Sequence, residues 1–162
     1  MTALLPYFIS GPPLFREAFN TSCDAINSLL LGNPYLEIML PMVDVRDAAS
    51  AHVVPLIDPF LLANNGRYLI STDSMWFSDI VDTINDARFE LKIGKIKARK
   101  LSRIEIYLAA IIINKKLKEV LPFVKQELKI ESSPDLIKAL QRWDKLDPDQ
   151  PVPITKSVVD MV

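Results

Sequence analysis

Short runs of apolar residues alternate along this chain with longer stretches in which apolar residues recur every three or four positions. The first run, from Thr2 to Ile9, is continuously apolar after Thr2, which is typical of a strand buried on both faces of a parallel sheet. Pro6 belongs near the end of such a strand, because proline cannot donate a hydrogen bond to the ladder. Ser10 to Pro13 then stops the strand, and a loop continues to residue 19.

The helix predicted after this loop has clear signals at both ends. Its N-cap candidates are Asn20, Thr21 and Ser22. Its apolar face is formed by Cys23, Ile26, Leu29 and Leu30. Gly32 supplies the left-handed residue that commonly ends a helix.

A strand followed by a helix is predicted twice more. Leu36 to Val45 is apolar enough for a strand, and Asp44 or Asp47 can cap a helix that continues to about Ile57. Pro55 should kink this helix or end it early. The residues expected to face inward are Ala49, Val53 and Leu56.

In the third unit, Arg67 to Ser71 is a short strand after Gly66, and Ser74 is expected to cap the next helix. The apolar residues of this helix recur at intervals of three and four: Trp76, Phe77, Ile80, Val81, Ile84 and Ala87. Strands that alternate with helices predict an α/β protein with mostly parallel strand pairing.

The pattern after Phe89 is weaker. Glu90 to Ile96 can form a strand, and further helices are expected at Arg103 to Ile112, Lys115 to Leu121 and Pro134 to Trp143. Residues 147–162 are expected to be an irregular tail, since three prolines lie near its start.

The composition excludes several partners and metal sites but says little about the fold. The net charge of −1 gives no overall attraction to polyanions, so we expect neither nucleic acid nor a membrane as partner. One cysteine and one histidine cannot form a thiolate or imidazole zinc site, and no carboxylate cluster suggests another metal. The lone cysteine and the absence of a long apolar segment lead us to expect a soluble cytoplasmic protein.

The chain lacks the motifs of several enzyme classes. Its glycines, Gly11, Gly32, Gly66 and Gly94, are too widely separated for a phosphate-binding loop. No tyrosine is followed four positions later by lysine, the pair with which short-chain reductases protonate a carbonyl. A Walker loop and a nucleophile elbow are also absent.

Four segments nevertheless follow one another in a recognisable order. They read PYFISGP (Pro6 to Pro12), NTS (Asn20 to Ser22), MVDVRDAASAH (Met42 to His52) and GRYLI (Gly66 to Ile70), and NKKLK (Asn114 to Lys118) comes later. Together they resemble the second half of extended short-chain dehydrogenases/reductases of the NAD-dependent epimerase/dehydratase superfamily. The nearest groups are the dihydroflavonol-4-reductase-like and 3-beta-hydroxysteroid-dehydrogenase-like members, and the resemblance covers about residues 2–143.

This resemblance implies the C-terminal portion of a Rossmann-type doubly wound fold with its substrate-binding subdomain, without the N-terminal dinucleotide-binding half. Residues 1–57 would be the last part of the sheet and a pocket wall, and residues 58–146 a substrate-side α/β subdomain. The whole chain would then be a single domain or a fragment of one.

The resemblance also implies roles for individual residues. The cofactor would be NAD or NADP, touched near its carboxamide by Pro6, Tyr7 and Ile9, with Ser22 near the pyrophosphate or the nicotinamide ribose. The substrate, a small apolar or aromatic carbonyl compound, would be lined by Leu14, Phe15 and Phe19. No catalytic residue and no metal ligand is implied, and tight cofactor binding by this chain alone is not expected.

Several other residues could be functional or only structural. Asp44, Arg46 and Asp47 could serve acid–base chemistry, but a helix cap with a local ion pair is the favoured interpretation. His52 is expected to be partly buried and structural, and Cys23 an inert core thiol. The basic stretch from Arg88 to Arg103 could bind phosphate-rich partners, although a solvated surface loop is the simpler interpretation.

Two functions of different classes follow. The first is a ketone or alcohol reductase dependent on NAD(P), of which this chain keeps the substrate-binding half and is inactive alone. The second is a non-catalytic α/β protein-interaction module derived from such an enzyme. In that case a second chain, either the missing half or another copy, would cover the edge of the Leu4 to Ile9 strand.

Overall fold

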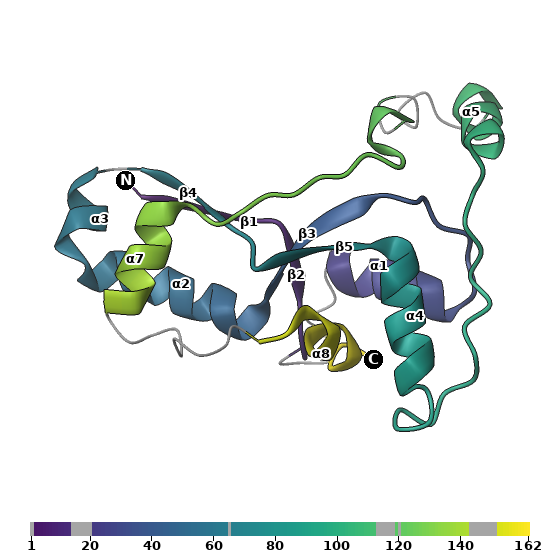
Figure 1. Cartoon of the computed structure of the whole chain (residues 1–162), viewed down its shortest axis with the longest axis horizontal. Helices are drawn as coiled ribbons and strands as arrows, with labels where there is room; N and C mark the ends of the chain where they lie inside the picture. Colours follow the sequence, from purple (N-terminus) through teal and green to yellow (C-terminus); the bar gives the residue numbers. More distant parts are fainter. Residues whose placement is uncertain (1, 14–20, 65, 113–118, 120, 143–151) are drawn as a thin grey trace.

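The computed structural model describes residues 2–13, 21–64, 66–112, 119, 121–142 and 152–162 (Figure 1). Its strands are β1 (Ala3–Pro6), β2 (Phe8–Ser10), β3 (Met39–Asp44), β4 (Arg67–Ile70) and β5 (Asp73–Trp76). Its longer helices are α1 (Thr21–Leu30), α2 (Val45–Ile57), α4 (Phe77–Ala87), α5 (Arg103–Ile112) and α7 (Pro134–Arg142). Three short helical segments complete it: α3 (Pro59–Asn64), the 3₁₀ turn η1 (Leu121–Phe123) and α8 (Ile154–Val159).

The strands form two small sheets, and the chain runs from one sheet to the other at two places. In one, β1 pairs in parallel with β4; in the other, β3 lies between β2, which is parallel to it, and β5, which is antiparallel. The chain passes from the first sheet to the second at Tyr7 and again between Ile70 and Asp73. Both crossings therefore occur where β1 and β4 end, and the two sheets diverge there.

One hydrophobic core lies between the first sheet and the helices α2, α3 and α7 (Figure 1). Tyr68 and Ile70 of β4 are buried in it, and Leu4 and Ile9 pack against it. Every residue of β1, by contrast, remains partly exposed. A second core lies between α1, α4, α8 and the second sheet, and its most deeply buried residues include Ile26, Met42, Ile84 and Val158.

The prediction of one continuous strand from Thr2 to Ile9, buried on both faces, is wrong. The run divides into β1 and β2 at Tyr7, and no residue from Thr2 to Ile9 is buried. The run contacts both cores instead: Leu4 and Ile9 pack against the first core and Phe8 against the second. In the described part of the chain, the outer edge of β1 has no neighbouring strand.

The inward face predicted for α2 is also wrong. Ala49, Val53 and Leu56 are exposed, whereas the buried residues of this helix are Ala48, Ala51, Val54 and Pro55. Pro55 does not end the helix, which continues to Ile57.

Smaller differences occur farther along the chain. Ser74 lies within β5 and caps nothing; α4 begins at Phe77 without a side-chain cap. No strand forms from Glu90 to Ile96. The tail is not wholly irregular, because Ile154 and Val158 anchor α8 in the second core. The helix at Arg103 to Ile112 is confirmed, as is the one from Pro134 as far as Arg142; the segment from Lys115 to Leu121 lies almost entirely outside the described residues.

Candidate functional site

The residues implied to face a nicotinamide lie at the divergence of the two sheets. Pro6 ends β1, and Tyr7 lies outside both ladders with 41% of its surface exposed. The side chain of Ile9 is partly buried and packs against the first core. Ser22 lies in the first turn of α1, a helix that contacts β2, and is buried. The structure therefore groups Pro6 and Tyr7 on an open surface and leaves the other two residues beneath it.

The residues implied to line the substrate pocket, Leu14, Phe15 and Phe19, lie outside the described residues.

A buried carboxylate lies beside Ser10, at the carboxyl end of β2. The side chain of Asp44, at the end of β3, is fully buried and forms two bonds of 2.8 Å with the Arg46 guanidinium. Asp44 also caps α2 by accepting the backbone N–H of Arg46 at 2.7 Å. Burial by itself would raise the pKa of Asp44, but hydrogen bonds from Arg46 and Ser157 outweigh burial and hold the pKa below its usual value. Asp44 is thus a helix cap and ion-pair partner that is ionised at neutral pH, the interpretation that the sequence favoured.

Gly11 makes the close approach to this carboxylate feasible. Its φ of +111° is one that residues with side chains rarely adopt. A Cβ there would lie 3.0 Å from Asp44 Oδ2 and 2.9 Å from Val45 Cγ1. The glycine of the PYFISGP motif is therefore required by packing against the first residues of α2.

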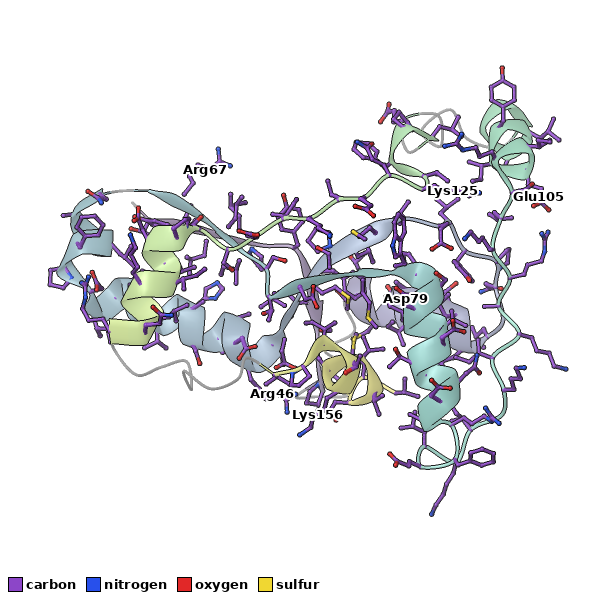
Figure 2. All side chains as sticks on the ribbon, viewed as in Figure 1. Arg46, Arg67, Asp79, Glu105, Lys125 and Lys156 are labelled. Carbon is purple, nitrogen blue, oxygen red and sulfur yellow. The ribbon has the colours of Figure 1, made fainter. Side chains whose placement is uncertain are left out.

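The C-terminal segment closes the other side of Asp44. The Ser10 and Ser157 hydroxyls are 2.7 Å apart and both buried, and Asp160 accepts a 2.9 Å bond from Arg46. Figure 2 shows Arg46 beside the α8 ribbon that carries Lys156. The backbone N–H of Val152 donates to Asp47 at 3.2 Å. The acidic and basic residues of the MVDVRD segment therefore hold the C-terminal helix in place.

The contacts and burial of the other candidate residues indicate structural roles. Burial is the main cause of a raised pKa at Asp47. His52 is exposed rather than partly buried, and its Nδ1 lies 2.7 Å from the Ala48 carbonyl one helical turn earlier. Cys23 is half-buried on α1. Among the described residues, no group of three His, Cys, Asp or Glu side chains could hold a metal ion.

One polar cluster was not predicted from the sequence. Glu37 is almost fully buried; its Oε1 accepts a 2.8 Å hydrogen bond from Ser78, and its Oε2 lies 2.6 Å from Lys100 Nζ. Tyr35, which pairs with Lys100 and stacks on Phe77, has a raised pKa, first because it is partly buried and second because of the Glu37 charge. A glutamate within an apolar run was the only sequence signal, and its partners lie 41 and 63 positions away.

The charged residues beside β2 offer little acid–base chemistry. Asp44 and Arg46, beside the end of β2, are both held in ion pairs. Position 11 is glycine, so Tyr7 lacks the lysine four positions later with which short-chain reductases pair their tyrosine.

Comparison with known proteins gives matches in structure only. No family model matches the sequence, and no curated protein matches it. Gre2 from Candida albicans, solved in complex with NADPH, is 27% identical with a TM-score of 0.56, covering 97% of this chain and 40% of that one. The gox2253 protein is 20% identical with a TM-score of 0.65, covering 99% of this chain and 47% of that one. A nucleoside-diphosphate-sugar epimerase from Pseudomonas aeruginosa is 12% identical with a TM-score of 0.61, covering 99% and 46%.

These likenesses confirm the predicted fold class. The chain has the α/β arrangement of Rossmann-like reductases and epimerases, and it spans only 40% to 47% of the length of these three structures. At the level of fold it is related to the short-chain dehydrogenase/reductase and epimerase superfamily.

Proposed function

We propose that this chain is the substrate-side part of an NAD(P)-dependent oxidoreductase of the dihydroflavonol-reductase-like group, acting on a small apolar or aromatic carbonyl compound. The dinucleotide loop and the acid–base pair would belong to the rest of the fold, in the same polypeptide or in another chain. Residues 1–162 would have no turnover by themselves.

The observation that carries this proposal is the position of Tyr7. In open α/β sheets, ligands bind outside the carboxyl ends of parallel strands, where neighbouring connections diverge. Tyr7 lies at that point, follows the carboxyl end of β1 and exposes its side chain. Pro6 and Tyr7 fit a wall for a flat nicotinamide ring, and a bound cofactor would supply the hydride. The residues of this chain would orient the ring and exclude water from one side of it.

The test is a titration of the ¹⁵N-labelled chain with nicotinamide mononucleotide, followed by amide chemical shifts. We expect millimolar binding, with shifts confined to residues 7–10 and to the start of α1. Adenosine monophosphate is the matched control, because it has the phosphate and ribose without the nicotinamide. NADPH should bind little more tightly than the mononucleotide, since the chain lacks a phosphate loop.

Three results would contradict the proposal. These are equal shifts with adenosine monophosphate, shifts located away from Tyr7, and no shifts at millimolar nicotinamide mononucleotide. Micromolar NADPH binding would show instead that the chain holds a complete cofactor site.

A second function, a non-catalytic interaction module, is favoured by one observation. The outer edge of β4 is closed, since Ser133 and Ser132 bond to the backbones of Leu69 and Ser71 at 2.8 to 3.0 Å. The outer edge of β1 has no strand beside it among the described residues. Open edges invite strand addition. Sedimentation velocity tests whether the chain associates with itself through this edge. A stable compact monomer at tens of micromolar would count against an interaction module that self-associates.

A further inference from the structure

The charges of this protein are divided unevenly along the chain. Residues 88–129 contain 12 lysines and arginines but only 4 acidic residues, whereas the rest of the chain contains 7 basic and 16 acidic residues. One continuous segment therefore has a formal charge of +8, and the remainder a charge of −9. The overall value of −1 conceals this separation.

The part of the positive segment that the structure describes follows one side of the molecule. It leaves the end of α4, runs as an extended chain past α4 and reaches α5 and η1, which project at one corner (Figure 1). Lys92, Lys95 and Lys97 are exposed along this path. Lys125, labelled in Figure 2, lies in the same corner as Glu105.

Large apolar side chains are exposed on the same segment. Ile104 on α5 is 73% exposed, and Tyr107 and Leu108, one turn later on the same helix, are about half exposed. Phe123 of η1 and Phe89, which is 79% exposed, add aromatic rings near the two ends of the path. Exposed apolar residues among basic ones are typical of a surface that binds a partner.

Helix α5 is held firmly enough to present these side chains. Ser102 and Glu105 form a reciprocal capping box, with N–H to oxygen distances of 2.8 and 3.3 Å. Glu105 accepts a 2.6 Å bond from Arg99, which is the main reason why its pKa falls to about 2. Ile106 and Val124 are buried, on α5 and directly after η1. The one acidic residue of α5 is therefore paired, and the exposed face remains apolar with basic neighbours.

We propose that this surface, formed by α5, η1 and the basic segment from Lys92 to Arg103, binds the face of a bilayer that contains anionic phospholipids. Ile104, Tyr107 and Leu108 would enter the headgroup boundary, and the exposed Lys92, Lys95 and Lys97 would lie against the lipid phosphates. This inference does not depend on the proposed reductase function.

One observation favours a bilayer over a nucleic acid. Single-stranded nucleic acids are bound by aromatic platforms; this segment exposes aromatic rings, but on α5 itself two of the three exposed residues, Ile104 and Leu108, are aliphatic. Aliphatic side chains gain free energy by entering the acyl boundary. In the described part of the chain no helix is long and apolar enough to cross a membrane, so the contact would be with the membrane surface.

The test is flotation of the protein with vesicles of phosphatidylcholine alone and of phosphatidylcholine with about one third phosphatidylserine. We expect binding to the anionic vesicles only, and much weaker binding at high salt, where screening shortens to a few ångströms. Ile104→Ser with Leu108→Ser should weaken binding roughly tenfold. Lys95→Ala with Lys97→Ala should weaken it about fivefold for each lysine.

The matched control is Leu56→Ser, because Leu56 is 72% exposed but lies on α2 in the negatively charged part of the chain. It should bind as the unchanged protein does, and circular dichroism should show all three variants folded. Equal affinity for neutral vesicles, no binding to anionic ones, or an equal loss with Leu56→Ser would overturn the proposal. Binding to heparin or DNA that is unaffected by the Ile104/Leu108 change would assign the surface to polyanions instead.

Discussion

At the residue scale, the end of β2 depends on a glycine and a carboxylate that fit each other. Gly11 lies against Asp44, and Asp44 in turn caps α2 and pairs with Arg46. The sequence predicted the cap and the local ion pair because both are contacts between neighbours in the chain. It could not predict the Ser10–Ser157 contact, which joins residues 147 positions apart.

Gly11→Ala should lower the free energy of unfolding by about 2 to 3 kcal/mol, because the backbone is strained for alanine and the new methyl group would press on Asp44 and Val45. Urea unfolding at neutral pH measures this loss. Gly94→Ala is the control: its Cβ would meet nothing within 4 Å, so a change of only about 0.5 kcal/mol is expected. Equal losses in both variants would contradict the packing argument.

Asp44→Asn should destabilise the protein by about 2 to 4 kcal/mol at pH 7, since it removes a buried charge that is bonded to Arg46 and Ser157. The folded-state pKa of Asp44 lies below its unfolded value. Its stabilising effect is therefore complete above about pH 4 and is lost as the pH falls through the folded pKa. Urea unfolding of both proteins at pH 7 and pH 3 should show the difference shrinking in acid. A constant difference would mean that the charge is not responsible.

At the element scale, the sequence predicted where most helices lie but not which face each one buries. Helix α2 contains apolar residues around most of its circumference, so its inward face is chosen by β3 and α7, which pack against it. Helix α8 was missed for a related reason. Its six residues are too few for a periodic signal, and the prolines before it suggested irregular chain.

Val158→Ala tests the docking of α8, because Val158 is fully buried in the second core. We expect a loss of about 2 kcal/mol in the free energy of unfolding. Val53→Ala, on the exposed face of α2, should change it by less than about 0.5 kcal/mol. Similar small effects for both would show that α8 is not part of the cooperative core.

Lys100→Ala tests the cluster that joins the extended segment to the second sheet. Without Lys100 the buried Glu37 carboxylate keeps only Ser78 as its side-chain partner in the described structure, so a loss of about 2 kcal/mol is expected. Lys97→Ala, an exposed neighbour, is the control for removing one positive charge. A loss that disappears at high salt would indicate general charge attraction rather than this buried pair.

At the scale of the whole molecule, the fold class and the order of its motifs were predictable from the sequence, whereas the division into two sheets was not. The apolar run from Thr2 to Ile9 predicts a strand, and Pro6 indicates where it ends, but nothing in the run shows that the chain enters a second sheet after Tyr7. That crossing is set by β3 and β4, which begin 32 and 60 positions after Tyr7. The candidate site was therefore identified by resemblance, and its exposure became visible only in the fold.

Hydrogen exchange tests the open edge of β1. The N–H of Ala3 donates to the Gly66 carbonyl beside β4, so by alternation the N–H of Leu5 also faces β4 and that of Leu4 faces away. In the isolated chain the Leu4 amide should exchange much faster than the Leu5 amide. Equal protection of the two amides would show that another strand covers this edge.

Pro6 limits how readily the open edge of β1 can pair with strands of other molecules. Like Leu4, it turns its backbone outward, and it has no N–H to offer an incoming strand. The edge therefore presents the Leu4 N–H as its outward donor within β1, too little to template the unbroken ladder of a fibril. A short partner strand could still be accepted, because the Leu4 and Pro6 carbonyls remain available as acceptors. Replacing this proline would be expected to turn a selective docking edge into a nucleus for aggregation.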